Sequence, residues 1–228
     1  NRITGNYKGG VYDTLYKPSK NIDLTIDSEL QVYGDSLMIN KFGSIIAIEP
    51  SSGAILSLIN APSFDPNLLI GRNRSKNYLE LKNDTIGKPL FDRGLQGQYP
   101  PGSTFKLVNG LIALQEKIID DKTLISCNQG HYYSSKRFMK CHCEIGTIND
   151  LNKAVYNSCN TYFANIYKRT IEKFPSHKNG INNWRSHVKS FGFGTYLGYD
   201  HPIGRPGLIP DSSYYDRWYP NGGWRAAT

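Results

Sequence analysis

Long apolar runs are missing from this chain of 228 residues, and no stretch approaches the ~20 consecutive apolar residues that cross a bilayer. Its first residues also show no basic segment followed by an apolar one, the pattern of a secretion leader. We therefore expect any secretion signal or membrane anchor to lie outside this chain. No internal repeat or low-complexity tract is visible, so a repeat architecture is excluded.

A clustered basic surface is also missing, although the net charge is +8, from 27 Lys plus Arg against 19 Asp plus Glu. The basic residues are scattered, and no stripe of them alternates with stacking aromatic residues. This distribution argues against a nucleic-acid partner. We interpret it as a soluble basic surface that faces an anionic cell wall or membrane.

The first hundred residues predict an arm, a short strand, a helix and a hairpin. Residues 1–20 show no sustained period and read as a linker from a preceding domain, and residues 21–26 alternate like a strand. Asp27 is a good helix N-cap. Two apolar runs at 44–49 and 54–60, joined by a Pro/Ser/Gly turn, predict a β-hairpin in the core of a sheet.

Helices dominate the remaining chain after a long polar loop at 62–98. We expect a central helix at about 103–115, with an apolar stripe made of Leu107, Leu111 and Leu114 with Val108 and Ile112 beside them. Two further helices are expected at 148–155 and 161–173, and loops with short strands from residue 191 onward. A hairpin followed by helices favours an α/β fold of the α+β type, with an antiparallel sheet packed against helices.

Ser103-Thr104-Phe105-Lys106 is the first motif that carries chemistry. Residues three apart share a helix face, so the Lys106 amine is within reach of the Ser103 hydroxyl. A serine needs a base to become a nucleophile, and a lysine of lowered pKa can be that base. The alternative is an N-cap serine with a surface lysine, as in the decoy at 186–189. The rigid YPPG lead-in favours the catalytic interpretation.

Ser158-Cys159-Asn160 is the second motif, placed in a break between two predicted helices. Residues two apart in an extended loop point the same way, so the hydroxyl and the carboxamide are expected to face one pocket. Ser158 is suited to relay a proton, and Asn160 to bind a substrate amide and the lysine. The same S-x-N pattern also occurs at 19–21, 75–77 and 126–128, so spacing alone does not single out this one.

The chain resembles the transpeptidase domain of class B penicillin-binding proteins, most closely the elongation type. The matching segments keep family order, and they are LTIDSELQ, SIIAIEPSSGAILSLINAPSFDPN, RGLQGQYPPGSTFKLVNGLIAL, AVYNSCNTYF and FGFGTYLGYDHPIG. The resemblance implies Ser103 as acyl-enzyme nucleophile, Lys106 as its base, and Ser158 with Asn160 as the second motif. It also implies a five-stranded antiparallel sheet flanked by helices.

The resemblance further implies D,D-transpeptidation of peptidoglycan stem peptides ending in D-Ala-D-Ala, with covalent inhibition by β-lactams and no required cofactor. It implies a location on the extracytoplasmic, periplasmic face of the bacterial inner membrane, through an N-terminal anchor outside this chain. The expected partner is a membrane glycosyltransferase of the elongation machinery. The family's third motif, K-[ST]-G, does not occur, and Lys122-Thr123-Leu124 comes nearest. We therefore expect residues 21–228 to be a transpeptidase domain truncated before that motif, without its C-terminal strands.

Two other functions are alternatives to transpeptidation. A β-lactamase or a β-lactam sensor would use the same acylation chemistry, but both lack the PSFDPN segment and the long polar loop. A catalytically inactive scaffold module is the other alternative, because the third motif is absent.

The cysteines Cys127, Cys141, Cys143 and Cys159 crowd into one stretch and have three interpretations. A disulfide between Cys127 and Cys141 would suit an oxidising compartment. A structural zinc would use Cys127, Cys141 and Cys143 with either His131 or His142. Unpaired thiols are the third, with Cys159 as a small buried filler. The sequence leaves all three open.

Overall fold

The computed structural model describes residues 21–134, 137–196 and 203–219, with no account of the Ser134 side chain. The chain forms two compact units, residues 1–94 and 95–228. The predicted linker at 1–20 lies outside the described residues. None of the described helices combines the length and the apolar character needed to cross a membrane.

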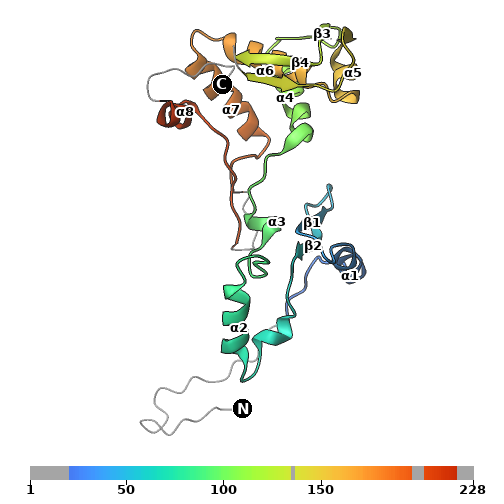
Figure 1. The fold of residues 1–228 in the computed structure, drawn as a ribbon, viewed down its shortest axis with the longest axis vertical. Coiled ribbons are helices and arrows are strands. Elements are labelled where there is room, and N and C mark those ends of the chain that lie inside the picture. Colours follow the sequence, from blue (N-terminus) through green and yellow to red (C-terminus); the bar gives the residue numbers. More distant parts are fainter. Residues whose placement is uncertain (1–20, 135–136, 197–202, 220–228) are drawn as a thin grey trace. The chain divides into compact units, whose positions relative to one another are not determined.

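The first unit is built on a two-stranded sheet and a helix beside it (Figure 1). Strands β1 (Gly43–Ile48) and β2 (Ile55–Ala61) pair antiparallel with a bulge at Ala47/Ile48, so the predicted hairpin is confirmed. Helix α1 (Ser28–Leu37) begins at the predicted cap, where the Asp27 carboxylate accepts hydrogen bonds from the N–H groups of Glu29 and Leu30.

Helix α1 covers β2 at very short range. A Cβ on Gly34 would lie 2.5 Å from Cδ1 of the fully buried Ile59, so only glycine allows this approach. The Gln31 carboxamide bonds both the N–H and the C=O of Leu58, at 2.9 and 3.1 Å. A side chain thus satisfies backbone groups of β2 that a further strand would otherwise pair.

The predicted strand at residues 21–26 is wrong. The segment is attached to β2 only by Thr25 Oγ1, which donates to the Ile55 carbonyl, and by the Asp27 N–H, which donates to that of Leu56. The predicted loop at 62–98 is also partly wrong, because it contains η2 (Pro66–Leu69), α2 (Arg74–Asn83) and α3 (Arg93–Gln96). Helix α2 buries none of its residues, so no apolar period marks it in the sequence.

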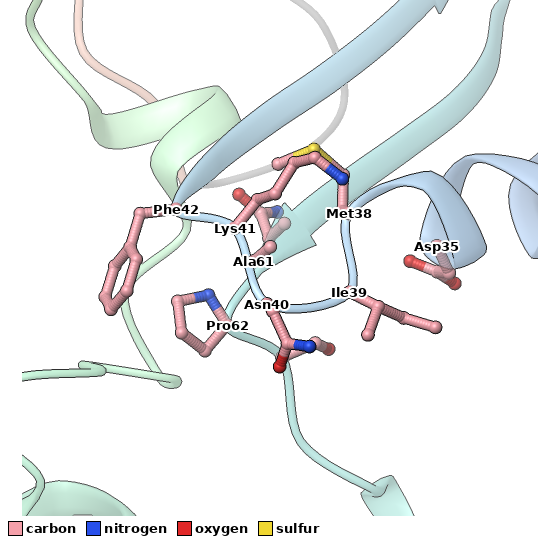
Figure 2. Close-up of a pocket in the computed structure, with 10 residues that line it drawn as sticks. Asp35, Met38, Ile39, Asn40, Lys41, Phe42, Ala61 and Pro62 are labelled. Atoms are coloured by element: carbon pink, nitrogen blue, oxygen red, sulfur yellow. The ribbon is translucent and has the colours of Figure 1, made fainter.

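A cavity of about 650 Å³ lies where α1 ends and β1 begins. Figure 2 shows residues of its wall, with Ile39, Asn40 and Phe42 on the connecting loop and Pro62 just after β2, beside Asn40 and Phe42. None of the candidate catalytic residues lines it.

The second unit carries most of the helices and two small sheets (Figure 1). Its elements are η3 (Gly102–Thr104), α4 (Phe105–Gln115), β3 (Ile125–Cys127), β4 (Gly130–Ser134), β5 (Arg137–Lys140), β6 (Thr147–Asn149), α5 (Leu151–Tyr156), α6 (Asn160–Glu172), α7 (His177–Ser190) and α8 (Ser212–Trp218). Strand β3 pairs antiparallel with β6, and β4 with β5. Across the described residues the strands form three two-stranded antiparallel sheets next to helices, an α+β arrangement.

The core of this unit lies between α4, α6 and α7, where Ala113, Ile166 and Val188 are completely buried. The helices predicted at 103–115 and 161–173 are therefore present as η3–α4 and α6. The predicted stripe is confirmed at Ile112, which is buried with Gly110 and Ala113 on α4. It is wrong at Leu107 and Leu111, which are 54% and 52% exposed.

Two other boundaries differ from the prediction. The expected helix at 148–155 begins only at Leu151, since Thr147–Asn149 form β6. Beyond Phe191 the described residues form helix α8 and no strand, in place of the expected short strands.

One carboxylate joins three helix segments. Glu116 ends α4, and its oxygens bond Lys173 Nζ at 2.7 Å, Asn183 Nδ2 at 2.8 Å and His187 Nε2 at 2.6 Å. These hydrogen bonds, with that from Lys173 first, lower the pKa of Glu116 from 4.5 to about 2.

We expect Glu116→Gln to lower the free energy of unfolding at pH 7 by about 1–2 kcal/mol, near the lower end of the about 1.5–3 kcal/mol that hydrogen bonds to a charged group contribute, because the Lys173 partner is 44% exposed. Because the folded pKa is depressed, this contribution is present above pH 4.5 and is lost as pH falls toward 2. Thermal melting should therefore separate Glu116→Gln from the wild type at pH 7 and bring them together near pH 2. Glu172→Gln, whose ion pair with Lys168 is exposed, is the matched control and should change melting little.

Candidate active site

Ser103 lies in the short helical turn η3, which leads directly into α4. The preceding Gly102 has φ +64, with nothing within 4 Å of the place where a Cβ would stand. A glycine there lets the chain turn sharply into the helix without strain. The Ser103 side chain is exposed, and its residue stands at the N-terminal end of a long helix, where free N–H groups favour developing negative charge.

Lys106 joins α4 to the segment in front of α6. Its Nζ donates to Ser158 O at 2.6 Å, to Ser158 Oγ at 2.9 Å and to Asn160 Oδ1 at 2.6 Å. An ammonium has three protons, so these three contacts satisfy it completely. The structure thus brings together three of the four residues that the sequence singled out.

Ser103 is the fourth, and among the described residues no hydrogen bond joins its hydroxyl to Lys106. Catalytic hydrogen bonds are often long in a ligand-free site and tighten when substrate binds. The helical spacing keeps Ser103 and Lys106 on one face of the turn, as the motif requires.

Burial lowers the pKa of Lys106 from 10.5, although the nearby thiols of Cys141, Cys159 and Cys143 act in the opposite direction. Desolvation disfavours the ammonium form, which is the direction that a general base needs. The Nζ also lies 5.9 Å from the centre of the Phe163 ring.

The segment 158–160 is held in an unusual conformation. Ser158 has φ +47, a left-handed value that costs a residue other than glycine about 1–2 kcal/mol. Cys159 is the N-cap of α6, and its sulfur accepts from the Tyr162 N–H. Asn160 donates from Nδ2 to the Lys140 carbonyl at 2.8 Å, which orients its Oδ1 toward Lys106. Strain of this kind persists only where the surroundings fix it.

The decoy motifs lack this environment. Ser186 and Lys189 are exposed on α7, and no hydrogen bond connects Lys189 to a serine. The motifs at 75–77 and 126–128 lie on α2 and around the end of β3, and among the described residues no lysine amine donates a hydrogen bond to either of them. The pair at 19–21 begins outside the described residues. Lys122-Thr123-Leu124 forms a turn before β3 and not a sheet strand, with Thr123 Oγ1 bonded to Asp120.

The four cysteines meet behind this segment. The sulfurs of Cys127, Cys141, Cys143 and Cys159 lie within 4.8 Å of one another, and all four residues are buried. Sγ of Cys141 is 3.5 Å from that of Cys143 and 3.8 Å from that of Cys159. No disulfide joins any of them, so the Cys127–Cys141 bridge, one of the three interpretations left open by the sequence, is not present.

Neither histidine named in the sequence is the fourth member of this group. His142 Nε2 contacts the Asn157 carbonyl at 2.6 Å, and His131 Nδ1 contacts Asn165 at 3.4 Å. Cys159 takes that place in the sulfur cluster, and it is fully buried. Sequence spacing did not indicate it, because Cys159 reaches the other three sulfurs only through the packing of α6.

The surroundings shift the pKa values of three of these cysteines in opposite directions. Burial acts to raise the pKa of Cys141, but hydrogen bonds with the backbone of Cys143 and Thr161 and with neighbouring thiols outweigh it and lower the pKa to about 5. Burial raises the pKa of Cys143 to about 11 and also raises that of Cys159. One thiolate among several thiols is the state expected of a buried sulfur cluster, since like charges oppose further ionisation.

Comparison with known proteins identifies the fold. The family described as penicillin binding protein transpeptidase domain matches residues 43–223. The peptidoglycan D,D-transpeptidase MrdA of Acinetobacter baumannii is 34% identical over 202 residues, which cover 86% of this chain and 28% of that protein. The chain thus spans less than a third of this relative's length.

Two solved structures support the same family assignment. The penicillin-binding protein PBP2 of Helicobacter pylori has a TM-score of 0.78 at 27% identity, over 94% of this chain and 39% of that one. The complex of PBP2 with MreC from the same organism gives 0.74 at 28% identity, over 88% and 36%. With a hairpin, a helical unit and both motifs in family order, the chain belongs to the penicillin-binding protein transpeptidase domain family.

Proposed function

We propose that this chain is the acyl-enzyme part of a peptidoglycan D,D-transpeptidase, with Ser103 as nucleophile. The observation that carries the proposal is the triple hydrogen bond of Lys106 to Ser158 and Asn160, one helical turn after Ser103. The family match and the D,D-transpeptidase named among the relatives support the same reaction.

The contacts of Lys106 indicate how it would hold and release a proton. Ser158 O and Asn160 Oδ1 only accept, so they retain two N–H groups even when the amine is neutral. The third contact, Ser158 Oγ, is able to donate or accept. Ser158 is therefore the partner through which Lys106 changes its protonation state without losing a contact.

The reaction follows from this arrangement. Ser103 Oγ would attack the carbonyl carbon of the penultimate D-Ala while its proton passes to Lys106, and the C–N bond to the last D-Ala would break. The leaving amine would take the proton by way of Ser158. The amine of a second stem peptide would then attack the ester carbonyl carbon, the C–O bond to Ser103 would break, and Ser103 Oγ would regain a proton from that amine. A β-lactam would form an ester with Ser103 as its ring C–N bond opens, and the released amine would stay attached to the acyl group.

A β-lactamase or sensor is the runner-up, since both share the acylation step. The matched relatives are transpeptidases and penicillin-binding proteins, which favours transpeptidation. A membrane glycosyltransferase partner and a periplasmic anchor outside this chain remain predictions. The MreC complex of the Helicobacter pylori relative supports a partner within the elongation machinery.

We expect a fluorescent penicillin to label Ser103 in the full-length protein. Peptide mapping by mass spectrometry should find the adduct on the peptide that contains Ser103, and Ser103→Ala should abolish it. Ser186→Ala, at the decoy motif, is the control and should label normally. Labelling that survives Ser103→Ala would refute the assignment.

Lys106→Gln is expected to keep donors for Ser158 O and Asn160 Oδ1 but to remove the base, and to slow acylation by about 10²–10⁴-fold. In the wild type the acylation rate should rise as pH rises through the lowered pKa of Lys106, because the neutral amine is the active form. The variant should lose this rise. Circular dichroism would check that it is folded, and an unfolded Lys106→Gln would point to a structural lysine instead.

We further propose that the four cysteines hold a structural zinc ion. Four sulfurs at about 2.3 Å from a zinc ion stand about 3.8 Å apart in a tetrahedron, and the two Sγ–Sγ distances of 3.5 and 3.8 Å fit this edge. Hydrogen bonds from Asn160 N to Cys141 and from Asn149 Nδ2 and Tyr162 N to Cys159 are the outer contacts that thiolate ligands use. The ion would neutralise thiolate charge and fix Cys159, the residue between Ser158 and Asn160.

Zinc content and thermal melting test this second proposal. We expect about one zinc per chain by inductively coupled plasma mass spectrometry, and a lower melting temperature after chelation. Cys143→Ser should lose the metal, whereas His142→Ala, a neighbour outside the sulfur cluster, should keep it. A wild type that binds no zinc under reducing conditions, or a His142→Ala variant that loses it, would contradict the four-thiolate site.

A further inference from the structure

Ser158 occupies a position in the cap of α5 where glycine is the usual residue. The Cys159 N–H donates to the Ala154 carbonyl at 2.9 Å, and the Ser158 N–H donates to that of Val155 at 3.0 Å. These two bonds are the pattern of a Schellman cap, whose left-handed residue is usually glycine. Here that residue is Ser158, with φ +47.

A serine at this position needs support from outside the helix. For a residue with a Cβ the left-handed conformation is disfavoured by a factor of about ten. Both acceptors that Ser158 offers to Lys106, its carbonyl and its hydroxyl, depend on this conformation. If the backbone rotated away, Lys106 would lose two of its three hydrogen bonds. We therefore looked for side chains that hold the peptide on each side of Ser158.

His142 holds the peptide unit that precedes Ser158. Its Nε2 lies 2.6 Å from the Asn157 carbonyl oxygen, and because a carbonyl only accepts, Nε2 carries the proton. Rotation of this peptide unit about the N–Cα bond of Ser158 is the angle φ itself. The hydrogen bond from His142 therefore acts directly on the strained angle.

Asn149 bonds the residue on each side of Ser158. Its side chain is fully buried at the end of β6, and the pairing with Ile125 of β3 fixes its backbone. The Asn149 Oδ1 accepts from Asn157 Nδ2 at 3.1 Å, and its Nδ2 donates to Cys159 Sγ at 3.6 Å. One buried carboxamide thus supports both neighbours of the left-handed residue.

We propose that Asn149 and His142 are positioning residues for acylation, which hold Ser158 left-handed and thereby keep its two oxygens on Lys106. This inference rests on the proposed function, since it concerns the rate at which Ser103 is acylated. Both residues act through the peptide around Ser158 and not on the reacting atoms. Their loss should therefore slow bond formation and leave the affinity for the unreacted β-lactam unchanged.

Rapid mixing of the full-length protein with a fluorescent penicillin separates these two quantities. We expect Asn149→Ala and His142→Ala each to lower the acylation rate constant by about five- to tenfold, the size of the conformational preference. The dissociation constant of the non-covalent complex should change by less than about twofold. His142→Gln, whose carboxamide is able to donate to the same carbonyl, should recover most of the lost rate.

Matched controls separate positioning from a general loss of stability. Asn183→Ala removes a carboxamide that bonds Glu116 at 2.8 Å, and His177→Ala removes a histidine at the start of α7. Both variants should keep the wild-type rate constant, because partial unfolding lowers the labelled fraction and not the rate of the folded molecules. If Asn183→Ala slowed acylation as much as Asn149→Ala, the positioning role would be overturned. If Asn149→Ala does not fold, the exposed His142 decides the question.

A glycine background tests the physical cause. Glycine adopts the left-handed conformation at no steric cost, so it does not need this support. In Ser158→Gly, which already acylates slowly without its hydroxyl, adding His142→Ala should lower the rate by less than about twofold. Equal losses in the serine and glycine backgrounds would show that His142 acts in another way and would overturn the proposal.

The outcomes separate this inference from the proposed function. If the wild type is acylated at Ser103 and both Asn149→Ala and His142→Ala keep its rate constant, the positioning role is wrong and the proposed function stands. If the folded wild type is not acylated at Ser103, the proposed function fails and the positioning role fails with it.

Discussion

The hydrogen bonds of Lys106 are the interaction on which the site depends. One Nζ atom joins α4 to the start of α6, and its contacts with Ser158 and Asn160 fix two side chains and one backbone carbonyl together. Without them α4 would still be bonded to the far end of α6 through Glu116 and Lys173, but the end of α4 that follows Ser103 would lose its hydrogen bonds to the segment 158–160. Burial that positions the lysine also lowers its pKa, so positioning and activation have one physical cause.

Alternate residues of the segment 158–160 face two different places, the Lys106 amine and the sulfur cluster. Ser158 and Asn160 face Lys106, while the sulfur of Cys159 between them faces the other three cysteines. Asn160 belongs to both sides, because its N–H donates to Cys141 and its carboxamide to the Lys140 carbonyl. A change in the sulfur cluster would therefore be transmitted to the candidate catalytic side chains of Ser158 and Asn160 through a single peptide unit, which is why the proposed zinc bears on the proposed acylation.

The features that could be predicted from the sequence are those set by residues close together in the chain. The Asp27 cap, the hairpin and the Ser103–Lys106 spacing depend on residues within one turn or one strand pair, and the structure contains all three. Helix α2 was missed because it has no buried face to give a period. The exposure of Leu107 and the role of Cys159 were missed because both depend on which distant segments pack there.

The strain of the left-handed backbone at Ser158 is opposed by the hydrogen bonds that this residue accepts from Lys106. The conformation costs about 1–2 kcal/mol, whereas each hydrogen bond to a charged group contributes about 1.5–3 kcal/mol. Lys106 makes two such bonds to Ser158 alone, so the surrounding contacts outweigh the strain. A glycine at this position would relieve the strain but lose the hydroxyl through which Lys106 is proposed to exchange its proton. A serine therefore suits this position although the backbone disfavours it, because its Oγ is the acceptor of Lys106 that is also able to donate.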